Sequence, residues 1–302
     1  MTQFSVEKRH QAKGKGCVVV ESFQECQQEN EFSKANVTSL INSYPLKLMI
    51  PSHASENNSI WVYPVTFGGG LVGGDGIEMT FHVKPHCCAV ITGQESTKVY
   101  HCEDALTTKQ TTRGTVEDHA LLCVMSDPVV CYRNSTFSQK QDFQMTSEGS
   151  LVYLDWVIGG RAALNELWQL TSYENRTDVY IDGELVYRDN FILQDTPTVS
   201  MVTAMKNMQV LGSCIIIGKQ METIATKLNT RFGMKKSIGE KYDQEIVVSV
   251  SPLRYSVAME TVPGVYIRFM TVSSSKAYKS VVSVIAEELR TLIGGNPFEG
   301  KY

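Results

Sequence analysis

The chain has 302 residues and a mass of 33.7 kDa, and 42% of its residues are hydrophobic while 20% are charged. This composition is that of a folded globular protein and excludes a disordered or collagen-like chain. Lysine and arginine number 28 against 32 aspartates and glutamates, which gives a net charge of −4. A chain with this balance is not expected to bind nucleic acid or an anionic membrane through its overall charge.

The sequence predicts neither a secretory signal nor a membrane span. The basic residues within 1–16 are not followed by an apolar run, and the longest apolar runs, such as Cys214–Ile217, are too short to cross a bilayer. The eight cysteines are therefore expected to be free thiols in a cytoplasmic protein rather than a disulfide framework.

A glycine-rich stretch at 68–76 follows a predicted strand at 60–67. Its first part, Gly68–Gly73, has the spacing G-x-G-x-x-G, which in dinucleotide-binding proteins is followed by a helix whose amides hold the pyrophosphate. Here the next segment, 77–83, alternates apolar and polar residues as a strand does. We therefore interpret the glycines as a bend between strands, and a nucleotide-dependent enzyme that uses Gly68–Gly73 is the weakest alternative.

All six histidines lie in the first 119 residues, and several lie near cysteines across a predicted hairpin. The group consists of His82, His86, Cys87, Cys88, His101 and Cys102. Imidazole and thiolate ligands suit zinc or copper, so a zinc- or copper-binding protein that uses this His82–Cys102 cluster is a second alternative. The spacing matches no zinc motif, and side-chain alternation would let His86 and Cys88 converge but would turn Cys87 away.

The rest of the chain predicts a mainly β fold with two helices. Residues 151–158 are apolar on both faces, as in a buried strand, and Asp182-Gly183 between two β-branched and aromatic runs predicts a hairpin. Helical spacing of apolar residues predicts α-helices at about 219–232 and 276–293. No repeat or linker divides the sequence, so we expect a single domain over 1–302, with 1–13 as a flexible N-terminus.

Several short motifs, in order along the chain, resemble those of the urease accessory protein UreD family, called UreH in some bacteria. They are Tyr44-Pro45-Leu46-Lys47, Gly69-Gly70-Leu71-Val72-Gly73-Gly74-Asp75, the segment Thr92–Tyr100 with Lys98 and Tyr100, Asp127-Pro128, Gly160-Arg161 through Asn165-Glu166, and Glu288-Leu289-Arg290. Ser126 and Asn165 replace the proline and the glycine of the family's motifs. The resemblance spans roughly residues 14 to 295.

The resemblance implies a long, solenoid-like helical winding of β-strands that carries the two helices. It also implies a non-catalytic role as a scaffold or chaperone in urease maturation. Such a protein binds the urease apoprotein, recruits a UreF-type helical accessory protein and a UreG-type GTPase, and helps deliver nickel(II) to the urease active site. Nickel is then a transient cargo that passes through an internal channel, and no tightly bound cofactor is expected.

A nickel passage should offer separate carboxylates, amides and water, because thiolate ligands would hold the ion too tightly to release it. Asp75 and Glu166 match the family's signature carboxylates and are predicted to line the path, with Arg161 orienting Glu166. The alternative is that both acids only fix turns. The other motif positions are predicted to be structural, namely Gly69, Gly70, Gly73, Gly74, Lys98, Tyr100, Asp127 and Pro128.

Overall fold

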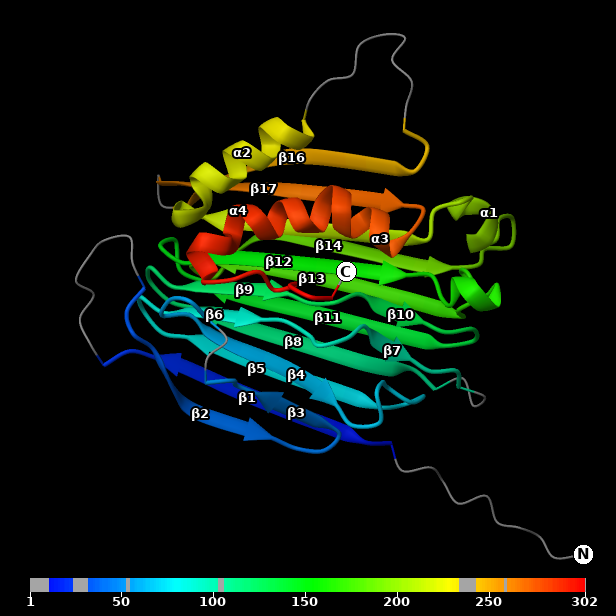
Figure 1. The fold of residues 1–302 in the computed structure, drawn as a ribbon, viewed down its shortest axis with the longest axis horizontal. Coiled ribbons are helices and arrows are strands. Elements are labelled where there is room, and N and C mark those ends of the chain that lie inside the picture. Colours follow the sequence, from blue (N-terminus) through cyan, green and yellow to red (C-terminus); the bar gives the residue numbers. More distant parts are fainter. Residues whose placement is uncertain are drawn as a thin grey trace, which may run out of the picture.

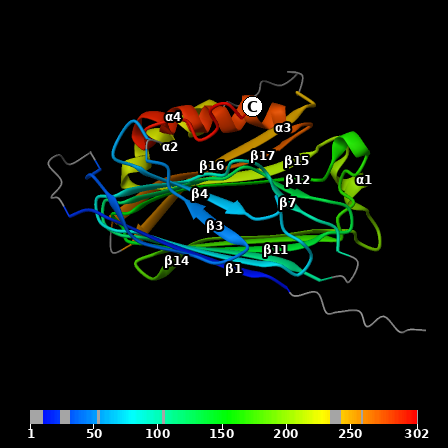
Figure 2. The same cartoon turned by 60° about the horizontal axis from the view of Figure 1, so that its bottom comes forward.

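The computed structural model describes residues 11–23, 32–52, 55–102, 106–233, 243–257 and 260–301. Two β-sheets stack on each other, and helices cover the outer face of one of them (Figures 1 and 2). Most of the segment predicted to be a flexible N-terminus, residues 1–10, lies outside the described residues.

The described strands form a seven-stranded and a ten-stranded sheet. The seven-stranded sheet has the order β14 (Glu184–Gln194), β13 (Ser172–Ile181), β11 (Thr136–Met145), β8 (Thr108–Val116), β5 (Gly76–Val83), β1 (Lys13–Glu21) and β2 (Asn36–Asn42). The ten-stranded sheet has the order β16 (Ile246–Val257), β17 (Glu260–Thr271), β15 (Val210–Gly218), β12 (Ser150–Ile158), β9 (Leu121–Met125), β6 (Cys88–Ile91), β4 (Ile60–Thr66) and β3 (Leu46–Met49). Two short strands, β7 (Thr97–Val99) and β10 (Val129–Cys131), pair with each other, and β10 also pairs with the end of β12.

The chain alternates between the sheets as it proceeds from β5 through β6, β8, β9 and β11 to β12. Strands β5, β8, β11 and β13 pair in parallel in one sheet, and β4, β6, β9 and β12 pair in parallel in the other. The predicted mainly β, solenoid-like winding is therefore confirmed. The hairpin expected between Cys88 and His101 is wrong, because β6 pairs in parallel with β4 and β9, and β7, which precedes His101, pairs in parallel with β10. The turn at 84–87 passes from one sheet to the other.

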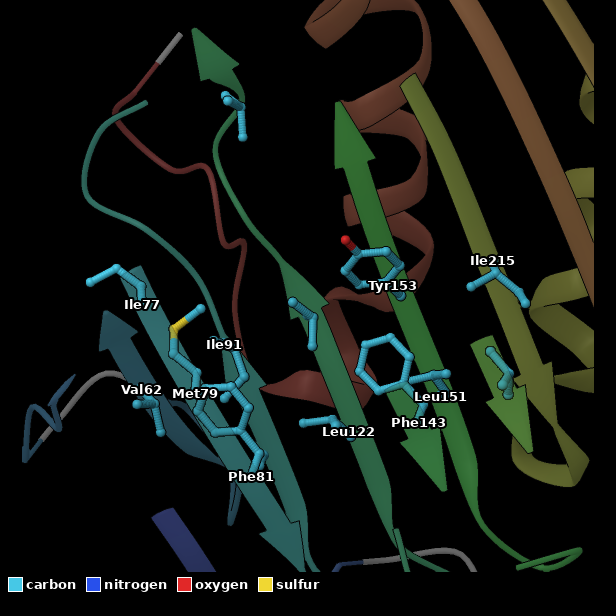
Figure 3. Close-up of a cluster of buried hydrophobic side chains, with 14 of the residues drawn as sticks. Val62, Ile77, Met79, Phe81, Ile91, Leu122, Phe143, Leu151, Tyr153 and Ile215 are labelled. Carbon is cyan, nitrogen blue, oxygen red and sulfur yellow. The ribbon is translucent and has the colours of Figure 1, made fainter. Parts of the chain in front are cut away.

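Alternating side chains explain why each strand faces two environments. In β5, Ile77, Met79, Phe81 and Val83 are buried toward the facing sheet, whereas Glu78 and His82 are half-buried on the other side. Figure 3 shows how side chains from both sheets, including Phe81, Leu122 and Tyr153, meet in this first core. The hairpin predicted at Asp182-Gly183 is confirmed, since β13 and β14 pair in antiparallel fashion around that turn.

Helices and the outer face of the ten-stranded sheet enclose a second core. A 3₁₀ turn (Lys219–Met221) leads into α2 (Glu222–Phe232), and α3 (Ser274–Ala277), a π-helical turn (Tyr278–Val282) and α4 (Ser283–Ile293) form one continuous helical stretch. These segments confirm the two predicted helices. Their apolar stripes pack on the outward side chains of β12, such as Trp156.

Two short elements were not predicted. They are a 3₁₀ turn (Ala162–Leu164) and α1 (Met201–Met205), where the Ser200 hydroxyl accepts a hydrogen bond from the Thr203 amide at 3.3 Å. Each is shorter than two helical turns, so neither leaves a periodic pattern in the sequence.

Candidate functional site

The interior between the two sheets contains two rows of polar side chains. Strand register places Gln110, Gln139 and Asn175 side by side across β8, β11 and β13. Two residues further along the same strands, a second inward-facing row consists of Thr112, Gln141 and Thr177. The Thr177 hydroxyl donates to Gln141 Oε1 at 3.1 Å. Buried polar rows between apolar rows are uncommon in a core unless they serve a polar site, because each buried group must find a partner.

A main cavity of about 400 Å³ lies against these rows. Apolar side chains such as Ile77, Met79 and Tyr153 form part of its wall, and polar groups form the rest. The polar lining residues are Thr66, Gln94, Glu95, Ser96, Thr97, Gln110, Thr112, Ser126, Asp127, Gln139 and Asp155. Gln94 and Glu95 are exposed, so the cavity reaches the surface of the molecule at that end.

Asp155 is an inward-facing carboxylate in the middle of the apolar strand β12. It accepts hydrogen bonds from Gln139 Nε2 at 2.9 Å and from Asn175 Nδ2 at 3.0 Å. Tyr173 lies close by, with its hydroxyl 2.7 Å from Gln139 Nε2. The Oδ1 atom of Asn175 is buried and has no hydrogen-bond partner within the described part of the chain, which leaves an oxygen acceptor next to the carboxylate.

The surrounding protein raises the pKa of Asp155. Asp155 is half-buried at the wall of the main cavity. Burial raises the pKa of Asp155 to about 6, although hydrogen bonds from Gln139 and Tyr173 act in the opposite direction; the negative charge of Asp189 adds to the rise. The carboxyl group therefore changes charge near pH 6.

Asp155 also lines a second space, the Arg268 cavity. This cavity measures about 160 Å³ and is lined by Asp155, Ser213, Arg268 and apolar residues of β14 and β15. Arg268 Nη2 donates to Asp189 Oδ2 at 2.6 Å, and the Tyr266 hydroxyl donates to the same oxygen at 2.9 Å. The Arg268 side chain is 46% exposed, so this cavity also reaches the surface. Asp155 thus lines both spaces.

The carboxylate predicted at Asp75 lies in the turn between β4 and β5. Its Oδ1 accepts from the Ala12 amide at 3.2 Å and its Oδ2 accepts from the Val72 amide at 3.0 Å. These contacts fit the turn-fixing alternative, and Asp75 lies on the wall of neither the main cavity nor the Arg268 cavity. Its place on a nickel path stays a prediction.

Glu166 forms a two-pronged ion pair with Arg161. The Arg161 Nε and Nη2 atoms each donate to one carboxylate oxygen at 2.7 Å, and the guanidinium lies 4.3 Å from the centre of the Tyr132 ring. Between them, Asn165 has a φ of 54°, the left-handed conformation that glycine adopts most easily. Neither Glu166 nor Arg161 lines the two cavities, so a role in the path stays a prediction for Glu166 as well.

Several of the remaining motif residues contact residues that line the main cavity. The Tyr100 hydroxyl donates to the Gly68 and Gly69 carbonyls at 3.4 and 3.3 Å, and Lys98 Nζ donates to Glu95 at 3.1 Å. Gly70 and Gly73 lie where a Cβ would collide with Lys98 or Cys102, and Gly74 has a φ of 88°. The Pro128 carbonyl accepts from the Thr97 amide at 3.0 Å, which joins β7 to β10.

Neither alternative site is assembled. The glycine-rich stretch is followed by strand β5, so the helix that a dinucleotide site requires is missing at that point. His82 pairs with Glu117 at 2.6 Å, and His86 stacks on His119 with ring centres 5.0 Å apart. Burial raises the pKa of Cys87 to about 11 and that of Cys88 to about 12, which keeps both thiols protonated. Within the described ranges no three His, Cys, Asp or Glu side chains lie close enough to hold a metal.

Comparison with known proteins gives the family. The family described as UreD urease accessory protein matches residues 25–300. Urease accessory protein D of Arabidopsis thaliana is 30% identical over 281 residues, which cover 88% of this chain and 95% of that protein. The chain belongs to the UreD urease accessory protein family.

Plant and bacterial members of the family share this similarity. Urease accessory protein D of Oryza sativa subsp. indica is 32% identical over 197 residues, 65% of this chain and 64% of that protein. Urease accessory protein UreD of Anaeromyxobacter sp. is 28% identical over 218 residues, 72% of this chain and 71% of that protein. The family membership predicted from the short motifs is therefore confirmed.

Sequence reasoning missed Asp155, Gln139 and Asn175. The available signal was a single acidic residue within an otherwise apolar strand, with amide residues at inward positions of the strands before and after it. None of the helices in the described part of the chain is long and apolar enough to span a membrane.

Proposed function

We propose that this UreD family member acts in urease maturation as a non-catalytic scaffold that passes nickel(II) through its interior to the urease apoprotein. Family membership supports a role in urease maturation, because the relatives are named as urease accessory proteins. The nickel path is carried by one observation, namely that Asp155 faces both the main cavity and the Arg268 cavity.

The chemistry of this path suits an ion in transit. Hydroxyl, amide and carboxylate oxygens line the main cavity, and one carboxylate in its depth neutralises part of the cation's charge. Nickel(II) binds thiolates and imidazoles tightly, whereas isolated oxygen ligands leave most of its water shell in place and release it readily. The buried thiols of Cys87 and Cys88 stay protonated and do not compete for the ion.

The scaffold role requires surfaces for the apoprotein, a UreF-type helical protein and, through the complex, a UreG-type GTPase. Large apolar side chains that are exposed in the free chain support such contacts. Tyr44 and Phe67 are 70% and 54% exposed, and their ring centres lie 5.8 Å apart beside the surface end of the main cavity. We expect this pair to be covered in the assembled complex.

The test is co-expression of the chain with its accessory partners and the urease apoprotein, in wild-type form and as Asp155→Asn. Assembly is measured by size-exclusion chromatography, and the nickel content and activity of urease are measured in the same preparations. We expect Asp155→Asn to assemble normally and to leave urease with several-fold less nickel.

A matched control is Asp178→Asn, which also changes a buried aspartate. Asp178 pairs with Arg176 and Arg188 and lines neither cavity, so its substitution should leave the nickel content unchanged in whatever protein assembles. Normal nickel loading by the Asp155→Asn complex would contradict the proposed path, and a chain that elutes apart from both partners and apoprotein would contradict the scaffold role.

A further inference from the structure

A lysine ammonium occupies a ring of three oxygens in the ten-stranded sheet. Lys301 Nζ lies 2.8 Å from Asp127 Oδ2, 2.7 Å from the Gly93 carbonyl and 3.3 Å from Thr92 Oγ1. Only 3% of the Asp127 side chain and 17% of the Lys301 side chain are exposed. A positive charge is therefore held by preformed oxygen ligands with little access to solvent.

These oxygens belong to two bends that interrupt neighbouring strands. The chain leaves β6 after Ile91 and enters β7 at Thr97, and it leaves β9 after Met125 and enters β10 at Val129. Continuous paired strands leave no opening through a sheet. At these two bends the strand pairing is interrupted, and side-chain and carbonyl oxygens lie where the paired backbone would otherwise be.

The oxygen ring borders two spaces. Gly93 and Asp127 line the main cavity on the inner side of the sheet. Gly93 and Lys301 line another space on the side of α4, the C-terminal cavity, which measures about 450 Å³ and is also bordered by Glu56 and Glu299. A cation that moves from the C-terminal cavity to the main cavity by this route must pass Asp127.

We propose that Asp127 Oδ2, the Gly93 carbonyl and Thr92 Oγ1 form an entrance site for a divalent cation, and that the Lys301 ammonium holds this site until the cation displaces it. The proposal rests on the nickel-passing function and adds the point of access. One carboxylate and two neutral oxygens make a weak site for a hydrated divalent ion, which suits an ion that must move on.

Lys301 can leave the site while the segment before it stays in place. Phe298 is fully buried, with its ring centre 6.5 Å from that of Trp156 and 6.0 Å from that of Tyr278. Between this anchor and Lys301, Gly300 has a φ of 74° and open space where a Cβ would stand. Rotation at Gly300 would break the 3.1 Å hydrogen bond from the Lys301 amide to the Phe298 carbonyl and would move the ammonium into the C-terminal cavity, while the Phe298 side chain stays in place.

The test measures nickel binding by the purified full chain with equilibrium dialysis, so it does not depend on urease. The variants are Lys301→Met, Asp127→Asn and the double variant, with Lys227→Met as the control. Lys227 lies on α2 and pairs with Glu288 at 3.1 Å, away from the three cavities. Because a charge-assisted ammonium contact competes with the metal, we expect Lys301→Met to lower the Kd for nickel at least about tenfold.

This increase in nickel affinity should be absent in the double variant, and Lys227→Met should bind nickel with the wild-type Kd. Wild-type affinity in Lys301→Met, or a gain that persists without the Asp127 carboxylate, overturns the proposal. Where Lys301→Met does not fold, Lys301→Gln removes the charge while keeping a hydrogen-bond donor, and the same two outcomes apply. If Asp155→Asn loses nickel loading of urease while Lys301→Met keeps the wild-type Kd, the proposed entrance site is wrong and the proposed interior path is still supported.

Discussion

Replacing Asp155 with asparagine should stabilise the protein while impairing nickel transfer. In the folded chain the pKa of Asp155 is raised to about 6 from an ordinary value of 3.8, chiefly by burial. A group whose pKa is higher in the folded state binds its proton more tightly there, so its stabilising contribution is present at low pH and lost as the pH rises through 6. At neutral pH the ionised carboxylate therefore weakens the fold.

The size of the effect follows from the two pKa values. A difference of about two units corresponds to about 3 kcal/mol once both states are ionised, as they are at pH 8. About half of this penalty is already present at pH 5, because the unfolded carboxyl is ionised there while the folded one is still protonated. Relative to Asp155→Asn, the wild type should lose about 1.5 kcal/mol of unfolding free energy between pH 5 and pH 8.

Urea unfolding of both proteins at several pH values, followed by tryptophan fluorescence, measures this difference. The asparagine introduced at 155 can still form hydrogen bonds, because the Gln139 amide can rotate so that its oxygen accepts from the new side chain. Any loss of unfolding free energy from the substitution itself is then the same at every pH. Asp178→Asn is the control, because the pKa of Asp178 is shifted in the opposite direction. Burial raises the pKa of Asp178, but hydrogen bonds from Arg188 and Arg176 outweigh it and hold the pKa below 3.8, so this variant's deficit should stay constant from pH 5 to pH 8. A flat difference for Asp155→Asn over the same range would refute the reasoning.

Substitutions at three further positions test other parts of the structure. A Cβ added in Gly93→Ala would lie 2.8 Å from Asp127 Oδ2, so we expect the carboxylate to shift and urease nickel content to fall several-fold with an unchanged circular dichroism spectrum; normal loading would contradict this. Asp75→Ala leaves two backbone amides without their acceptor and should lower the unfolding free energy by about 1–2 kcal/mol, whereas Asp75→Asn should recover part of the stability and load urease normally. Loss of nickel loading in Asp75→Asn would instead place Asp75 on the path. Leu289→Ala creates a cavity under α4 and should lower the unfolding free energy by about 2–5 kcal/mol in urea, and a smaller loss would show that this core closes around the gap.

Local patterns predicted most of the elements of the fold. Alternation in 77–83 and the Asp182-Gly183 turn depend on neighbouring residues only, and the apolar stripes of α2 and α4 repeat often enough to identify helices. The connection after β5 could not be obtained in this way. A tight turn between two strands fits a hairpin equally well, and the passage to the other sheet depends on pairing with β8 and β9 more than 20 residues further along.

The candidate site depends on contacts that lie still further apart in sequence. Asp155 faces Gln139 and Asn175 only because β11, β12 and β13 lie in two facing sheets with a particular register. A strand that is apolar on both faces gives no sign of which side meets a cavity, so the acidic residue could not be assigned to an interior path. The Lys301 contact joins residues more than 170 positions apart and leaves no local pattern.

The central claim, that nickel crosses the interior of the protein, is tested most directly by shielding from an external chelator. A nickel-loaded complex of the chain with its accessory partners is mixed with urease apoprotein in the presence of excess chelator coupled to dextran, which is too large to enter the cavities. We predict that urease acquires nickel from the wild-type complex despite the chelator, and that the Asp155→Asn complex transfers several-fold less under the same conditions. Complete loss of transfer from the wild-type complex when the chelator is present would contradict an interior path.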